Sequence, residues 1–206
     1  EYPGVPNFPV KNIFNKVDIP INNIFAQPLL DIITDLLLKT KEDNILIFVV
    51  SEPGGEKLKR KLQGILDKDY KKYDNIPWIG VIGGKTGQEE KNKCLGNIPT
   101  NELKPGKHGK FKRRVIFATP AIEFSITLED DLPYVIDSGL GYTVIYDYNL
   151  NCTVLELKYV YKSNIHQRCG RTGRKAPGNC IRLYTKKKYE SLGDFEPPSI
   201  IKSELF

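Results

Sequence analysis

Residues 167–174 read Gln-Arg-Cys-Gly-Arg-Thr-Gly-Arg. On a helix, where each residue advances by about 100°, Gln167, Arg171 and Arg174 project from one face because they are spaced i, i+4 and i+7. Arginine keeps its charge and binds oxygens in a bidentate way, while a glutamine amide can orient a water molecule without adding charge. Gly170 and Gly173 each cost a helix about 1 kcal/mol relative to alanine, which indicates a close backbone approach. The octet therefore predicts a polyphosphate-binding helical face, and the alternative is a solvated basic helix end.

Outward from the octet, amphipathic segments alternate with short apolar runs, which is typical of an α/β fold with a parallel sheet and crossover helices. The run from Ile45 to Val50 is continuously apolar, as expected of a strand covered on both faces. The predicted helices span 28–39, about 56–66 and 88–94, and the predicted strands span 45–50, 78–82, 114–118, 134–137 and 180–184.

The segment 142–161 interrupts this alternation. Its β-branched and aromatic residues flank Asn149-Leu150-Asn151, which predicts an inserted β-hairpin. From the residues alone, this hairpin is an antiparallel extension of the sheet.

Composition limits the kind of protein. A chain of 206 residues, 40% hydrophobic and 27% charged, suffices for one substantial core. No apolar run approaches a membrane span and no signal peptide is visible, so the chain is expected to be intracellular and without a membrane partner. The absence of methionine, even at position 1, predicts a fragment of a longer protein.

The net charge of +6 agrees with a polyanionic partner. The basic stretch 104–114 is either a flexible solvated loop or a nucleic-acid contact. Four cysteines, at 94, 152, 169 and 180, lack CxxC pairing and nearby histidines at zinc spacing. They predict reduced thiols, no metal site and no disulfide.

Polar side chains follow several of the predicted strands, at the edge where open α/β sheets bind ligands. Thr119 follows one strand, and Asp137 ends another, where it could also be a turn or cap residue. Ser51 follows Phe48-Val49-Val50. Gly83-Gly84-Lys85-Thr86-Gly87 suggests a phosphate-binding loop, but that motif requires glycine at the position of Ile79, so we reject it.

The octet resembles the last conserved motif of superfamily 2 helicases, in the register of the DEAH branch and its viral relatives. The resemblance implies that Arg171 and Arg174 are arginine fingers that reach the γ-phosphate of ATP bound on another domain. It also implies that Gln167 helps to place the attacking water. Arg168 points about 100° away from that face, so we expect a structural or interdomain role for it.

Residues 118–127 resemble a second motif of these helicases, in which Thr119 contacts the nucleic-acid backbone and Ser125 lies near the nucleotide. Pro120 and residues 123–127 are closer to poxvirus-type RNA helicases, which implies a large DNA virus as the source. The same resemblance implies that Asp137 binds the ATP ribose, and that Ser51 and Lys85 lie near the nucleic acid.

The resemblance spans nearly the whole chain and implies a RecA-like parallel sheet flanked by helices. Residues 1–27 would be a linker from a missing first RecA-like domain, 28–190 the second RecA-like domain, and 191–206 a segment that leads to a missing C-terminal domain. ATP with Mg²⁺ would be bound mainly by the first domain, so the isolated chain is expected to be inactive. The hairpin would project toward the nucleic acid and separate its strands.

The expected function is therefore an ATP-dependent helicase that acts on single-stranded RNA or DNA, in the host cytoplasm if viral and otherwise in the nucleus or cytoplasm. Two alternatives stay open. The first is a nucleic-acid-binding or scaffold module without catalysis, and the second is a translocase that does not separate strands. The sequence does not distinguish RNA from DNA, since phosphate contacts dominate binding to both.

Overall fold

The computed structural model describes residues 7–122, 131–147 and 151–196. Its centre is a six-stranded parallel sheet in the order β1-β8-β5-β2-β4-β3. The α/β fold with a parallel sheet is confirmed. The strands are β1 (Val10–Phe14), β2 (Ile45–Phe48), β3 (Trp78–Ile82), β4 (Arg114–Ala118), β5 (Tyr134–Asp137) and β8 (Gly178–Arg182).

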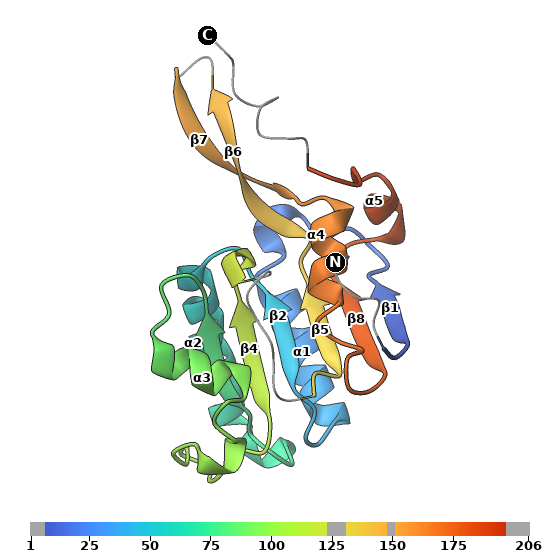
Figure 1. The fold of residues 1–206 in the computed structure, drawn as a ribbon. Helices are drawn as coiled ribbons and strands as arrows, with labels where there is room; N and C mark the ends of the chain where they lie inside the picture. Colours follow the sequence, from blue (N-terminus) through green and yellow to red (C-terminus); the bar gives the residue numbers. More distant parts are fainter. Residues whose placement is uncertain (1–6, 123–130, 148–150, 197–206) are drawn as a thin grey trace.

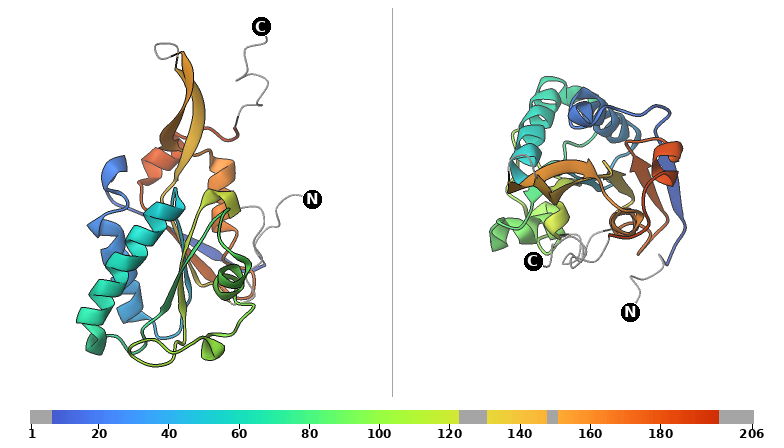
Figure 2. Two further views of the ribbon diagram at one scale, coloured as in Figure 1. Left: turned by 90° about the vertical axis from the view of Figure 1, so that its left-hand side faces the viewer. Right: turned by 90° about the horizontal axis from the view of Figure 1, so that it is seen from above.

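Helices cover both faces of this sheet (Figure 2). One face carries α1 and α2, and the other carries α3 and α4. Their bounds are α1 (Gln27–Lys39), α2 (Glu52–Lys68), α3 (Gln88–Leu95) and α4 (Lys162–Cys169), and a short α5 (Lys186–Glu190) follows β8. Single 3₁₀ turns occur at Ile21–Asn23, Tyr70–Lys72, Thr100–Glu102 and Pro120–Ile122.

The core consists of two apolar layers because side chains alternate along each strand. Ile45 and Ile47 of β2 pack toward α1 and α2, whereas Leu46 and Phe48 pack in the layer that includes Cys94 of α3. All four residues of β2 are buried, as the continuous apolar run predicted.

The hairpin is a separate two-stranded sheet of β6 (Leu140–Asp147) and β7 (Cys152–Tyr159). It projects from the sheet edge at which β2, β4 and β5 end (Figure 1). Neither strand pairs with the six-stranded sheet in the described ranges, so the alternative of an antiparallel extension is wrong. The side chains of Tyr142, Val144 and Tyr146 are exposed, so the hairpin buries little apolar surface that could hold it against the main sheet.

β1 is a strand that the sequence did not predict. It lies within residues 1–27 and pairs in parallel with β8, from Val10 opposite Gly178 to Phe14 opposite Arg182. The three central residues of β1 are exposed, so it lacks the apolar run that marked the inner strands. The segment expected to be a linker thus supplies one edge of the sheet.

Two arginines of the basic stretch are part of the interior. Arg113 is fully buried, and its guanidinium donates to the carbonyl oxygens of Leu37 (2.8 Å), Thr40 (2.6 Å) and Asn75 (2.9 Å). Arg114 is equally buried and donates to the Lys93 carbonyl at 2.9 Å. Neither a solvated loop nor a nucleic-acid contact describes these two residues, because burial requires them to bond carbonyl groups within the chain.

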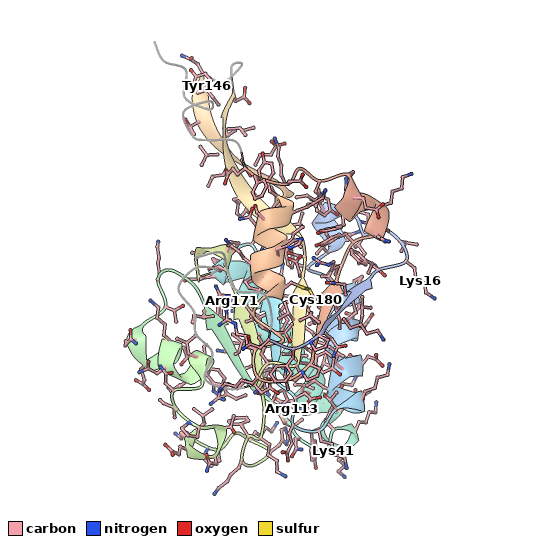
Figure 3. The ribbon with its side chains drawn as sticks, turned by 45° about the vertical axis from the view of Figure 1, so that its right-hand side comes forward. Lys16, Lys41, Arg113, Tyr146, Arg171 and Cys180 are labelled. Carbon is pink, nitrogen blue, oxygen red and sulfur yellow. A yellow bond between two sulfur atoms is a disulfide. The ribbon has the colours of Figure 1, made fainter. Side chains whose placement is uncertain are left out.

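Cys169 and Cys180 form a disulfide that joins the end of α4 to β8 (Figure 3). The expectation of four reduced thiols is therefore wrong for this pair, because the fold brings together two cysteines whose spacing carried no signal. Cys94 and Cys152 are free. Burial raises the pKa of Cys94 to about 12.

Across the described ranges, histidine, cysteine and carboxylate side chains do not gather into a possible metal site, and none of the helices is long and apolar enough to span a bilayer.

Candidate functional site

The octet does not form one continuous helix. α4 ends at Cys169, and Gly170 has ψ near 3° as its C-cap. The amides of Arg171 and Thr172 then bond three residues back, to the carbonyls of Arg168 and Cys169, and Gly173 has φ +74°. The prediction of a single helical face for Gln167, Arg171 and Arg174 is thus wrong. The glycines that weakened the helix end it, and a φ of this sign favours glycine.

The last turn of α4 and the turn that follows it nevertheless keep these three residues in one short segment. The Gly173 carbonyl accepts from Phe8 N at 3.0 Å, and Arg174 Nε donates to the Gly170 carbonyl at 3.0 Å. Arg174 is exposed and Arg171 is half-buried at the end of α4 that points away from the hairpin (Figure 3). The turn therefore presents two guanidinium groups on a tethered backbone.

Gln167 lies in the last turn of α4, next to these arginines in the chain. Its Oε1 is buried and has no hydrogen-bond partner among the described residues. A buried amide oxygen without a partner costs free energy of about 1 to 3 kcal/mol. Such an oxygen is suited to accept from a water or ligand that completes the site.

Arg168 faces the interior, which fits the structural one of the two roles expected for it. Its side chain is 1% exposed, and Nη1 donates to Asp137 Oδ1 and to the Leu140 carbonyl, both at 3.1 Å. Its guanidinium also lies 5.3 Å from the centre of the Phe48 ring. The octet is thereby anchored to β2, β5 and the first residue of the hairpin.

Asp137 is fully buried at the end of β5. Oδ1 accepts from the Gly139 amide at 2.9 Å as well as from Arg168, and Oδ2 accepts from the Tyr184 hydroxyl at 2.8 Å. This geometry fits the turn and packing role that the sequence left open. It argues against a ribose contact, because neither carboxylate oxygen faces solvent.

The sheet register gathers three other predicted residues at one edge. Ile82, Ala118, Phe48 and Asp137 form a continuous row across β3, β4, β2 and β5. Thr119, Ser51 and the loop of Lys85 all leave the sheet directly beyond this row, on the side from which the hairpin projects (Figure 1). Parallel strands present their carboxyl ends together, so the edge expected from the sequence exists.

The three residues differ in what their side chains do. Thr119 Oγ1 is buried and has no partner in the described part of the chain. Ser51 Oγ accepts from the Gly54 amide at 3.2 Å, so it caps α2. Lys85 is exposed. Ser125, the remaining predicted site residue, lies outside the described residues.

Glu52 makes a contact at this edge that the sequence analysis missed. Its Oε1 accepts from Lys85 N at 2.9 Å, and a Cβ on Gly83 would lie 2.1 Å from the same oxygen. The Gly83–Gly87 loop thus wraps an acidic side chain, which would repel a phosphate in the same place. An acidic residue at a helix start was visible in the sequence, but it signals only a favourable interaction with the helix dipole.

Comparisons with known proteins agree with this arrangement. The family model described as the helicase conserved C-terminal domain matches residues 28–176. Protein L540 of Acanthamoeba polyphaga mimivirus, which carries the provisional name of an ATP-dependent RNA helicase, is 28% identical over 98% of this chain and 27% of its own length. The Arabidopsis thaliana DExH-box ATP-dependent RNA helicase DExH6 is 32% identical over 78% of this chain and 11% of its own.

Among solved structures, the E. coli DExH-box NTPase HrpB matches with a TM-score of 0.72 and 22% identity, over 96% of this chain and 22% of that one. This likeness shows the fold. The chain spans about a quarter or less of the length of these three relatives.

Proposed function

Because this chain belongs to the helicase conserved C-terminal domain family, in the DEAH/DExH-box group of superfamily 2, we propose that it is the second motor domain of an ATP-dependent helicase acting on RNA or DNA. The observation that carries the proposal is the end of α4 and the turn after it. This segment holds exposed Arg174, half-buried Arg171 and the Gln167 oxygen, which has no partner among the described residues. Arginines held in this way neutralise charge that develops on a transferring phosphoryl group.

In this proposal the turn acts on ATP held mainly by another domain. Arg171 and Arg174 bind the γ-phosphate, and Gln167 Oε1 accepts from the attacking water. Mg²⁺ is proposed to be bound together with ATP, mainly by that other domain. A nucleotide role for Ser125 rests on the resemblance alone, and the burial of Asp137 leaves it without a free oxygen for the ribose.

The carboxyl edge of the sheet supplies part of the nucleic-acid track. Thr119 places a buried hydroxyl without a partner among the described residues at this edge, and Lys85 offers an exposed positive charge. Ser51 lies at the same edge, but its hydroxyl oxygen already accepts the hydrogen bond that caps α2. The hairpin extends from this edge and is proposed to separate strands.

Residues 1–27 and 191–206 are proposed to connect to further domains. A viral source, supported by the mimivirus relative, stays a prediction.

We expect Arg171→Ala in the whole polypeptide to lower nucleic-acid-stimulated ATP turnover by about 10³-fold or more, since an arginine finger contributes about 10³ to 10⁵ in such enzymes. Phosphate release measured with saturating ATP and single-stranded RNA or DNA tests this. Arg60→Ala is the matched control because Arg60 is exposed on α2, on the other face of the sheet.

Unchanged turnover in Arg171→Ala would reject the motor assignment and favour a non-catalytic binding module. Equal losses in both variants would instead indicate a general effect of removing positive charge. A protein that hydrolyses ATP but does not unwind a duplex would support the translocase alternative.

A further inference from the structure

A cluster of buried polar side chains lies where the hairpin joins the domain. We call Asp137, Arg168, Arg182 and Tyr184 the root cluster. Each is at most 4% exposed, and they come from β5, α4, β8 and the residues just after β8. Burial of ionised groups is costly unless they are paired and hydrogen-bonded, so their arrangement is specific.

Arg168 connects the octet to the first residue of the hairpin. Its Nη1 donates both to Asp137 Oδ1 and to the carbonyl of Leu140, each at 3.1 Å. Leu140 begins β6 and pairs with Tyr159 at the end of β7. The same guanidinium nitrogen therefore contacts the sheet and the base of the projecting arm.

Tyr184 contacts the base of the hairpin from the side of β8. Its hydroxyl donates to Asp137 Oδ2 at 2.8 Å and accepts from Arg182 Nη1 at 3.0 Å. Burial, followed by the charge of Asp137, raises the pKa of Tyr184, so the hydroxyl keeps its proton. Its ring packs edge-on against Tyr159, with centroids 5.9 Å apart, and touches the place where a Cβ on Gly139 would be.

Gly139 fits this contact because of its backbone conformation. It has φ +69°, its amide donates to Asp137 Oδ1, and its carbonyl accepts from Val160 N at 2.8 Å. Gly139 and Val160 are the residues that enter and leave the hairpin. Since neither hairpin strand pairs with the main sheet in the described residues, the direction of the arm is set at this base.

We propose that the root cluster is a coupling clamp: Arg168 and Tyr184 are positioning residues that make the hairpin move with the octet. α4 shifts when Arg171 and Arg174 bind a nucleotide. Arg168 transmits this shift to Asp137 and to the Leu140 carbonyl together. The arm then turns as one body with α4. This inference rests on the proposed helicase function but concerns residues that touch neither nucleotide nor nucleic acid.

The test is Tyr184→Phe in the whole polypeptide, because it keeps the ring and removes only the hydroxyl. Tyr134→Phe is the matched control: Tyr134 begins the same strand that Asp137 ends, and its hydroxyl has no hydrogen bond within the described residues. ATP turnover, duplex unwinding, the melting temperature and amide exchange at Gly139 and Val160 are measured for both variants and the unmodified protein.

We expect Tyr184→Phe to keep the ATP turnover of the unmodified protein and to unwind about tenfold fewer base pairs per ATP, because a hydrogen bond to a charged group shifts an equilibrium by about that factor. Exchange at Gly139 and Val160 should rise by about the same factor, as the clamp opens locally. Tyr134→Phe should change neither quantity.

Two results would overturn the clamp. In one, Tyr184→Phe matches the unmodified protein in unwinding per ATP and in amide exchange. In the other, ATP turnover and unwinding fall by the same factor and the melting temperature also falls. That is the result expected for a residue that only stabilises the fold. Failure of the proposed function is distinct, because it appears as absent ATPase or unwinding in the unmodified protein. Unchanged amide exchange in Tyr184→Phe then rejects the clamp independently.

Discussion

At the scale of single residues, buried arginines organise the polar interior of this domain. Arg113, Arg114, Arg168 and Arg182 are all at most 4% exposed. Arg113 and Arg114 bond mainly backbone carbonyls, whereas Arg168 and Arg182 surround one carboxylate. A planar guanidinium with five donors can satisfy several carbonyl groups that would otherwise be buried without partners.

Arg113→Ala should lower the free energy of unfolding by about 3 kcal/mol or more, because it leaves the carbonyls of Leu37, Thr40 and Asn75 without this donor. In a chain of this size that corresponds to a fall in melting temperature of about 10 °C. Thermal and urea unfolding followed by circular dichroism measure both quantities.

The neighbouring variant Lys112→Ala is the control. Lys112 Nζ forms only an exposed pair with Glu42 at 3.5 Å, and such pairs contribute little. Its melting temperature should stay at the wild-type value. If both variants lost the same stability, Arg113 would have no special role in the interior.

At the scale of elements, the disulfide fixes α4 to β8 across the turn that carries Arg171 and Arg174. Its two cysteines are 11 residues apart in the chain. A closed loop of this size restricts the unfolded chain by about 3 kcal/mol in the chain-entropy account.

Cys180→Ala should therefore reduce the free energy of unfolding by about 3 kcal/mol relative to the oxidised protein. Cys152→Ala should not, because Cys152 is exposed and free. Thiol titration in denaturant without reductant should find the Cys94 and Cys152 thiols free, and all four cysteines only after reduction. Four free thiols before reduction would contradict the disulfide.

The inner strands were predictable because each is marked in the sequence by a short apolar run. β3, β4 and β5 have the predicted bounds, since they are short apolar runs buried between helices. β1 was not predictable in this way because only Val10 and Phe14 are even partly buried. The end of α4 was missed because octet spacing alone does not show that Gly173 adopts φ +74°.

The candidate site was predictable only in part, for a related reason. The octet and Thr119 were recognisable from short stretches, but the partners of Asp137 come from residues 31 and 47 positions away. Glu52 likewise meets Lys85 across 33 positions. Contacts of this kind depend on strand order and register, which a single sequence does not display.

At the scale of the whole molecule, most of the predicted site residues lie in two places, while Asp137 is buried between them. The turn after α4 lies toward the sheet face that α3 and α4 cover, and Ser51, Lys85 and Thr119 follow the carboxyl edge. The Gly83–Gly87 loop encloses Glu52, whose negative charge argues against a phosphate site there. In the proposed function, Arg171 and Arg174 therefore act on a nucleotide held by another domain.

The 206-residue chain alone should hydrolyse no ATP, whereas the polypeptide that contains it should do so in the presence of nucleic acid. Phosphate release at equal protein concentration measures the difference. Lys85→Ala in the isolated chain should leave the background unchanged. Robust turnover that this substitution abolishes would show that the loop binds phosphate and that the domain assignment is wrong.

In the described residues the hairpin contacts the domain near its base, through residues such as Leu140, Leu157 and Tyr159, and this gives it the properties of a lever. β6 spans eight residues, so the arm is about 26 Å long at about 3.3 Å per residue. A rotation of about 10° at Gly139 and Val160 would carry its tip about 5 Å, given that length. Shifts at the base too small to disturb core packing would become displacements on the scale of a nucleotide at the far end of the arm.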